Sequence, residues 1–386
     1  MFLQKRHVYW IAGLAAAVIV YFAWVYTADA ADLGGNCCAD LEERISELEA
    51  TAAKKGNRKV SLTVYGQVSK GILFLDDGEE DDAFVRENSA AESFVGFRGE
   101  AKIDKDWSAG FLIEIGVGGF DERGEYGFGF GGSDTNDLYT RHAVLYVAGP
   151  IGKVSLGHTS QSTDSIAEIT VANTAVAARM LSLRPLNGPQ FGEVLDIFDG
   201  TRGNLVRYDT VVMGGFQGSA SWSGTAGDED VWDAALRFGG EFGGFRVAAG
   251  AGYRDGVLIP GLVIPSVDVQ VLSGSASVKH VATGLFVSGA AGRVSPGSGT
   301  DLTGWHVQGG FENNVTKLGN TTIFGEFATL EIDGSDASPQ LYGGGVVQSF
   351  DNAAFDLFIN LRILDPDSGD ESDDVTTGMV GGRIRF

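Results

Sequence analysis

The segment Met379-Val380-Gly381-Gly382-Arg383-Ile384-Arg385-Phe386 decides the fold, because its residues alternate between two kinds of surface. One side carries Val380, Gly382, Ile384 and Phe386, and the other carries Met379, Gly381, Arg383 and Arg385. A strand has a side-chain period of two, so one face can contact lipid and the other water. A closed barrel pairs its last strand with its first, which holds the terminus in the wall. The segment therefore predicts the final strand of a transmembrane β-barrel.

The same period of two continues through the rest of the chain from residue 60. Ser61, Thr63, Tyr65 and Gln67 alternate with apolar residues and glycine, and the same alternation recurs at 355–363. Short turns alternate with longer, acidic, glycine-rich connections, which is the asymmetry of outer-membrane barrels. Counting the strands between these connections gives about sixteen, which places both ends of the barrel on the periplasmic side. We therefore expect an all-β fold, a transmembrane antiparallel barrel over residues 60–386.

Composition excludes several classes of function. The chain has 386 residues and a formal charge of −23, which argues against nucleic acid as a partner. Its five histidines lie in no metalloprotease or hydrolase motif, so we expect no enzyme. Strand parity places two of them, His142 and His158, on the outward side of the wall.

The first thirty residues have the features of an export leader. Lys5, Arg6 and His7 precede an apolar run, and Ala28-Asp29-Ala30 gives an A-x-A cleavage pattern. We expect a signal peptide at 1–30. The alternative is an uncleaved inner-membrane anchor, because the apolar run is longer than an average signal core.

Residues 31–59 form a second segment with a helical period. Leu41, Ile45, Leu48 and Ala52 are spaced four, three and four residues apart. This periplasmic segment is either a small coiled coil between chains or a frayed linker helix. Cys37 and Cys38 precede it, and an oxidising compartment would allow an interchain disulfide.

One connection, residues 160–203, is far longer than the others. A loop of this length is expected to have a function of its own. It mixes small and apolar residues with charges and contains a helix-compatible stretch at 173–181. We expect this third loop to fold into the lumen; the alternative is an extracellular flap.

These features together resemble the general-diffusion porins of Gram-negative outer membranes, in particular the alphaproteobacterial type. The resemblance covers about 60–386. Segments that carry it are Leu62-Thr63-Val64-Tyr65-Gly66-Gln67, Val95-Gly96-Phe97-Arg98-Gly99-Glu100, Arg141-His142-Ala143-Val144-Leu145-Tyr146, Gly152-Lys153-Val154-Ser155-Leu156-Gly157, Val206-Arg207-Tyr208-Asp209 and the terminal Phe386. The resemblance implies a homotrimer of sixteen-stranded barrels in which the third loop narrows each pore. It also implies that Phe386 serves as an assembly signal for the barrel-insertion machinery.

In that family, basic residues on the wall face acidic residues on the third loop, and the field between them sets the charge preference. Where the family often has an inward arginine, this chain has Phe94, so we expect a weak cation preference. The alternative is that the arginines only pair with wall carboxylates. Inward residues by parity are Arg98, Arg141, Arg207, Gln67, Glu100 and Glu114; the loop supplies Arg179 and the expected counter-charges Asp164, Glu168, Glu193, Asp196 and Asp199.

The expected function is a passive, water-filled channel for small hydrophilic solutes and ions. Two alternatives are a substrate-specific channel, which needs a binding constellation in the lumen, and a structural protein that tethers the envelope through the N-terminal helix. No cofactor is expected, although the acidic loops at 76–82 and 365–374 could hold Ca²⁺. They could also bind lipopolysaccharide through divalent ions.

Overall fold

The computed structural model describes residues 59–76, 78, 81–88, 90–117, 138–180, 198–224, 230–257, 268–297, 299–336, 338–365 and 374–386. The predicted leader, Cys37, Cys38 and all but one residue of the predicted helical segment lie outside these ranges. No helix among the described residues is long and apolar enough to cross a membrane.

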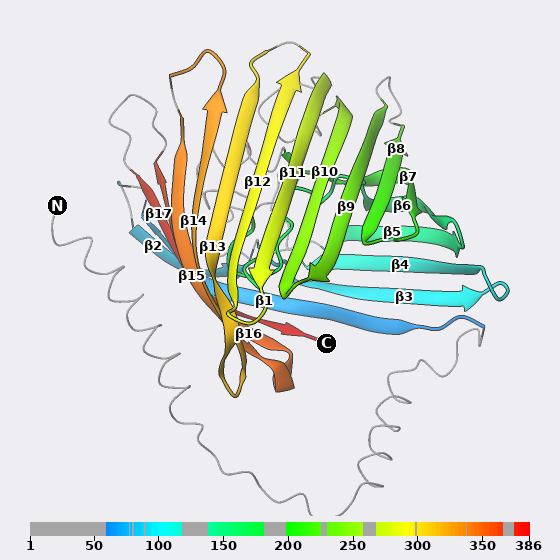
Figure 1. The fold of residues 1–386 in the computed structure, drawn as a ribbon, viewed down its shortest axis with the longest axis horizontal. Coiled ribbons are helices and arrows are strands. Elements are labelled where there is room, and N and C mark those ends of the chain that lie inside the picture. Colours follow the sequence, from blue (N-terminus) through cyan, green and yellow to red (C-terminus); the bar gives the residue numbers. More distant parts are fainter. Residues whose placement is uncertain are drawn as a thin grey trace, which may run out of the picture.

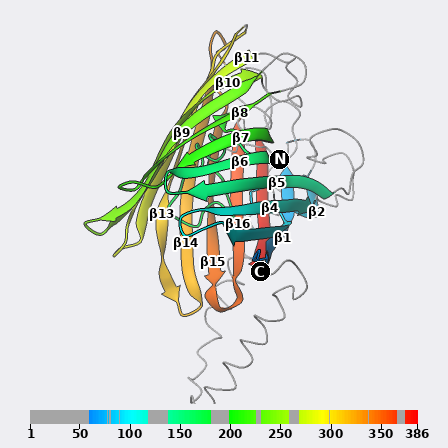
Figure 2. The same ribbon diagram turned by 90° about the vertical axis from the view of Figure 1, so that its right-hand side faces the viewer.

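The described residues form one antiparallel sheet that closes on itself (Figures 1 and 2). Each strand pairs with the next along the chain, except that β2 and β3 both pair with β1, and β1 also pairs with β17, from Gln67 opposite Arg385 to Asp76 opposite Thr376. The strands are β1 (Thr63–Asp76), β2 (Asp81–Glu87), β3 (Phe94–Lys102), β4 (Ser108–Val117), β5 (Leu138–Gly149), β6 (Gly152–Ser160), β7 (Arg202–Thr210), β8 (Phe216–Ser223), β9 (Val231–Phe242), β10 (Phe245–Val257), β11 (Asp268–His280), β12 (Leu285–Pro296), β13 (Leu302–Thr316), β14 (Gly319–Ile332), β15 (Gln340–Phe350), β16 (Phe355–Asp365) and β17 (Val375–Arg385).

These seventeen strands make a wall of sixteen, because β2 and β3 act as one interrupted strand. Both pair with β1: β2 covers Lys70–Asp76, and β3 covers Thr63–Gln67. The predicted closed barrel of sixteen strands is confirmed.

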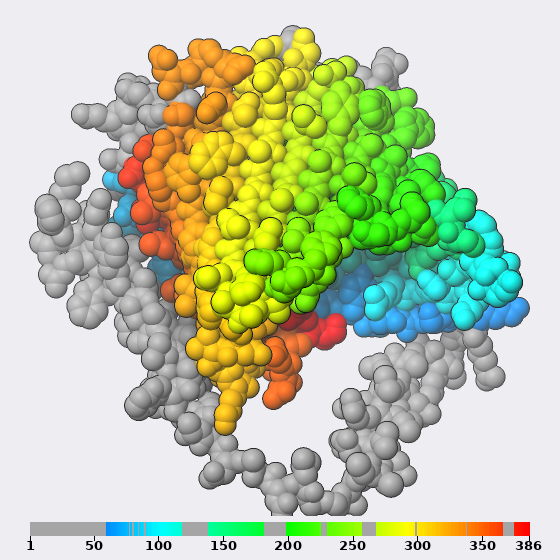
Figure 3. Space-filling view, viewed as in Figure 1, coloured from blue at the N-terminus to red at the C-terminus, as the bar shows by residue number. Residues whose placement is uncertain are grey.

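The two faces of the wall differ as the alternation predicted. Large apolar side chains, among them Val64, Val68 and Leu145, are exposed on the outer face. Their neighbours one position along, such as Ser69 and Val144, are buried on the inner face. Figure 3 shows the outer surface of β9 to β14 as continuous, strand beside strand. The outer face can therefore contact lipid while the inner face encloses the lumen.

The connections are sorted between the two ends of the barrel as expected. Tight turns join β5 to β6, β9 to β10 and β13 to β14, and Asp351–Ala353 forms a short 3-10 turn, η2, between β15 and β16. In the β9–β10 turn, Gly243 and Gly244 have φ values of 58° and 81°, which glycine adopts without strain. The longest connection with described residues joins β6 to β7, and this third loop folds inward against the wall.

Candidate functional site

The first part of the third loop, residues 161–180, follows the inner wall and is bonded to one strand after another. Ser162 N donates to Ser221 Oγ of β8 at 3.2 Å, and Thr163 N donates to Asp233 of β9 at 2.6 Å. On β11, Ser275 Oγ accepts from Ile169 N at 2.9 Å and donates to the carbonyl of Ile166 at 2.6 Å. Wall hydroxyls and carboxylates thus satisfy backbone N–H groups that a loop in a lumen would otherwise leave to water.

Four consecutive loop carbonyls, those of residues 176–179, accept hydrogen bonds from the wall. The donors are Asn88 to Val176, Asn360 to Ala177, Gln308 to Ala178 and Arg362 to Arg179. Here the loop makes a turn closed by Ala178 N donating to Thr174 O at 2.8 Å. No helix is formed in 161–180, although 173–181 is helix-compatible, because these carbonyls bond to side chains of the wall instead of to amides further along the chain.

Apolar contacts complete the attachment of the loop. Ile166, Val176, Met180 and Phe198 are each at most 1% exposed, and the last three pack against inward apolar residues of the wall. Gly250 and Gly292 of the wall make room for them: a Cβ at Gly250 would lie 2.6 Å from Ile166 Cδ1, and one at Gly292 would lie 2.3 Å from Phe198 Cδ1. The loop is therefore fixed along one side of the lumen by polar and apolar contacts together.

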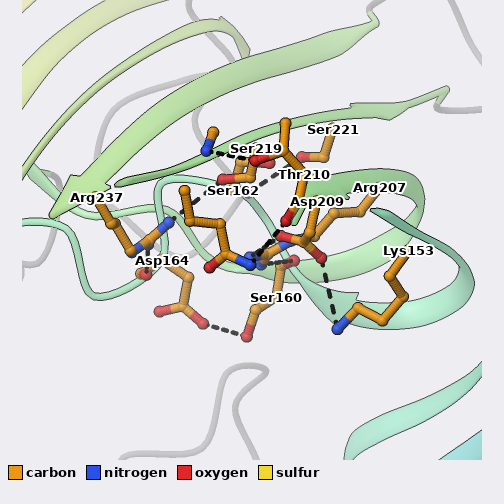
Figure 4. Close-up of polar contacts among 12 residues, drawn as sticks. Lys153, Ser160, Ser162, Asp164, Arg207, Asp209, Thr210, Ser219, Ser221 and Arg237 are labelled. Atoms are coloured by element: carbon orange, nitrogen blue, oxygen red, sulfur yellow. Dashed lines mark hydrogen bonds and ion pairs between the residues drawn. The ribbon is translucent and has the colours of Figure 1, made fainter. Parts of the chain in front are cut away.

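Arg207 on β7 holds the start of the loop. Its guanidinium donates to the carbonyls of Ser160 and Gln161 at 3.1 and 3.0 Å, and to Asp209 Oδ1 at 2.9 and 2.8 Å (Figure 4). Lys153 lies 3.5 Å from the other oxygen of Asp209. We expected Arg207 to face the loop acids. In the structure it is bonded to a wall carboxylate, Asp209, and to backbone carbonyls at the start of the loop.

Arg141 on β5 is bound between two glutamates. It contacts Glu92 and lies 3.4 Å from Glu114, and its Cζ lies 5.0 Å from the ring centroid of Phe94. Gln67, the neighbour of Phe94 across the β1–β3 pair, donates to the carbonyl of Glu92 at 2.8 Å. Arg141 is thus also paired with carboxylates of the wall and not with the loop acids, which agrees with the alternative stated for these arginines.

A β-bulge corrects the predicted orientation of His142. Glu114 pairs with His142, but the next residue, Ile115, pairs with Thr140, so Arg141 is the extra residue. The bulge resets the alternation, and both side chains reach the inner face. His142 Nε2 lies 3.7 Å from Glu114, and His142 Nδ1 lies 3.0 Å from Thr159 Oγ1. His142 is therefore inward, and the outward assignment from strand parity was wrong for this residue.

Arg98 and Glu100 on β3 lie at the periplasmic end of the lumen. Arg98 pairs with Thr63, the first residue of β1, and its Cζ lies 5.3 Å from the Tyr65 ring centroid. Glu100 accepts a hydrogen bond from Tyr146 Oη at 3.0 Å. Asn88, which holds the loop at Val176, is bonded to Ser69. Ser69 is six residues along β1 from Thr63, a distance of about 20 Å. Among the described residues, no ion pair joins Arg98 to the loop acids that we expected as its counter-charges.

The described part of the loop carries more acid than base. Asp164 accepts from Ser160 Oγ, and Glu168 lies 3.5 Å from Arg179. Asp199 accepts from Ala167 N at 2.8 Å; burial and the neighbouring Glu168 raise the pKa of Asp199 well above its usual value. Glu193 and Asp196 lie outside the described residues. Within the described ranges, no three His, Cys, Asp or Glu side chains are grouped to hold a metal ion.

Sequence reasoning missed the residues that anchor the loop. Ser273, Ser275 and Ser277 alternate on the inner face of β11, and this run of hydroxyls at a period of two was visible in the sequence. Other anchors gave no signal of their own, because their partners are distant in the chain: Asn360 and Ala177 are 183 residues apart.

Comparison with known proteins identifies the family of this barrel. The sequence profile of the Gram-negative porins matches residues 15–360. No curated protein matches the chain significantly. Among solved structures, an anion-selective porin from Comamonas acidovorans is similar, with a TM-score of 0.63, 17% identity, and coverage of 85% of this chain and 100% of that one.

Two other solved structures have the same fold. OprB of Pseudomonas putida has a TM-score of 0.62 at 12% identity and covers 90% of this chain and 97% of its own. The trimer form of OmpT from Vibrio cholerae has a TM-score of 0.59 at 15% identity and covers 85% of this chain and 99% of its own. These likenesses support the closed barrel, and the profile match over most of the chain shows the family. The chain belongs to the Gram-negative porin family and is an outer-membrane channel, not an enzyme.

Proposed function

We propose that the channel passes small hydrophilic solutes and ions by passive diffusion, with a weak preference for cations. The observation that carries this proposal is the charge of the lumen loop. Its described part contains three acidic residues, Asp164, Glu168 and Asp199, and one basic residue, Arg179. A net negative loop beside the aqueous path lowers the free energy of a cation there more than that of an anion.

Several wall cations are already paired with wall carboxylates, although Arg237 and Arg254 lie beside the loop and donate to the carbonyls of Asp164 and Asp199. Arg141 and Arg207 are each bound to wall carboxylates. Lys279 contacts Glu312, and Arg362 lies 2.7 Å from Glu326. Phe94 stands next to Arg141 at a position where a cation would have faced the lumen.

The charge preference is tested by the reversal potential of the refolded protein in a planar bilayer under a KCl gradient. We expect a modest cation preference, and Phe94→Arg should shift the potential toward anions because it adds a positive charge to the wall. Phe94→Leu is the matched control and should leave the potential unchanged. Anion preference of the unmodified channel would overturn the proposal and leave the pore itself intact.

We further propose that the barrels assemble as a homotrimer, which is supported by the trimer form of the similar Vibrio cholerae OmpT. Conductance steps that close in threes would agree with this assembly. Single steps from protein that cross-links only as a monomer would contradict it.

A further inference from the structure

Three tyrosines on β1 and β5 share one arrangement on the inner wall. Each ring lies across a glycine of the neighbouring strand, and each hydroxyl donates to a glutamate. A Cβ added at these glycines would fall 2.2–2.5 Å from a ring atom, so glycine is required for the rings to lie flat. The sets are Tyr65 on Gly96 with Glu114 at 2.6 Å, Tyr146 on Gly110 with Glu100 at 3.0 Å, and Tyr139 on Gly116 with Glu92 at 3.0 Å.

Two of these tyrosines, Tyr65 and Tyr146, contact two oppositely charged side chains that are not paired with each other, Arg98 and Glu100. Arg98 and Glu100 are two residues apart on the same face of β3, and both are exposed. Within the described residues no ion pair or hydrogen bond joins them. Arg98 stacks on Tyr65 instead, and Glu100 is held by the hydroxyl of Tyr146. Residues two apart on a strand are separated by about 6.6 Å, so the rings keep a positive and a negative group apart at a set spacing.

The chemistry of this pair selects a solute that carries both charges. A guanidinium with free N–H groups binds a carboxylate through two parallel hydrogen bonds. The Glu100 carboxylate has acceptor sites beyond the one used by Tyr146, and an ammonium group can donate to them. A plain anion would be repelled by Glu100 and a plain cation by Arg98. Because the tyrosines already restrict both side chains, less conformational entropy is lost on binding.

We propose that Arg98 and Glu100, held by Tyr65 and Tyr146, form a weak binding subsite for zwitterionic solutes of the amino-acid type. This inference rests on the proposed function, since the solute must be able to enter the lumen. The subsite lies at the periplasmic mouth, where a solute leaves the channel. It is open to water, so that binding is weak enough to permit release.

The test is the concentration-dependent change in single-channel current and current noise of the whole refolded protein at pH 7. Three probes of similar shape differ only in charge: L-leucine is a zwitterion, L-leucinamide a cation and 4-methylpentanoate an anion. We expect leucine to modulate the current at lower concentration than either of the other two. Arg98→Gln and Glu100→Gln should each raise the apparent Kd for leucine about tenfold, because each removes a charge-assisted hydrogen bond.

Arg246→Gln and Glu241→Gln are matched controls, because this exposed pair lies on other strands, β10 and β9, with side chains 3.3 Å apart. Both controls should leave the apparent Kd unchanged. Normal ion conductance shows that each variant has folded. Equal responses to all three probes, or an effect of Arg98→Gln without one of Glu100→Gln, would overturn the zwitterion subsite. A folded protein that conducts no ions would instead contradict the proposed diffusion function.

Discussion

Phe386 and Gly66 join the two ends of the barrel. The amide of Phe386 donates to the carbonyl of Gly66 at 3.1 Å, and the amide of Gly66 donates to the carbonyl of Phe386 at 3.0 Å. The phenyl ring lies against Gly66, where a Cβ would come within 2.7 Å of its Cζ atom. The terminal residue is thus part of the closing seam between β1 and β17 and is not a frayed end.

Gly66→Ala should weaken this seam. Its Cβ would also lie 2.4 Å from the carbonyl oxygen of Phe94, which is backbone and cannot move without shifting the wall. We expect a loss of about 1–3 kcal/mol in the free energy of unfolding, measured by urea titration of the refolded barrel.

Gly239→Ala is the control for this substitution, because a Cβ at Gly239 meets no atom within 4 Å. It should be neutral or slightly stabilising, since alanine lowers the entropy of the unfolded chain. Equal unfolding midpoints for the two variants would show that the contact at Gly66 is unimportant.

The attachment of the third loop predicts a local effect of Ser275→Ala. The hydroxyl of Ser275 both accepts from Ile169 N and donates to Ile166 O, so its loss leaves two loop groups without partners. Opening of the loop should become easier by about 1–3 kcal/mol. We therefore expect at least fivefold faster hydrogen–deuterium exchange in a peptide from residues 161–180, with the barrel strands unchanged.

Ser223→Ala is the matched control for the loop. The Ser223 hydroxyl donates to the carbonyl of Asn204 at 2.8 Å, a contact between wall strands that does not involve the loop. Faster exchange of the loop in this variant, or unchanged exchange in Ser275→Ala, would contradict the assigned anchor.

The barrel was predictable from sequence because alternation and turn residues are local properties. The side-chain period fixes which residues face lipid, and short turns fix which strands are neighbours. Arg141 shows the limit of this reasoning: one bulge reverses the parity before it, so both Arg141 and His142 reach the lumen. Strand parity alone assigns only one of the two to that face.

The path of the loop could not be predicted for a different reason. Its contacts are with strands far away in the chain, 59 residues for Ser162 and Ser221 and 106 for Ile169 and Ser275. The partners of Arg207 are likewise decided by that path, since two of its four hydrogen bonds go to loop carbonyls. Sequence identifies such an arginine as inward but does not indicate whether it faces the solute or holds the loop.

The charge of the loop predicts a pH effect centred on Asp199. Burial and Glu168 raise the pKa of Asp199, so the folded protein binds this proton more readily than the unfolded chain. The stabilising contribution of the proton is therefore complete below the ordinary aspartate pKa and is lost as pH rises through the raised value. When pH falls from neutral, Asp199 should lose its charge before an ordinary aspartate does, and the cation preference should decrease.

Reversal potentials at a series of pH values from 7 to 4 would measure this change. Asp199→Asn removes the charge but keeps an oxygen that can accept from Ala167 N, so its selectivity at neutral pH should match that of the unmodified channel in mild acid. Glu241→Gln, an exposed change on β9, should preserve the pH response. If Asp199→Asn shows the same pH-dependent shift as the unmodified protein, another carboxylate must carry the effect and the role assigned to Asp199 is wrong.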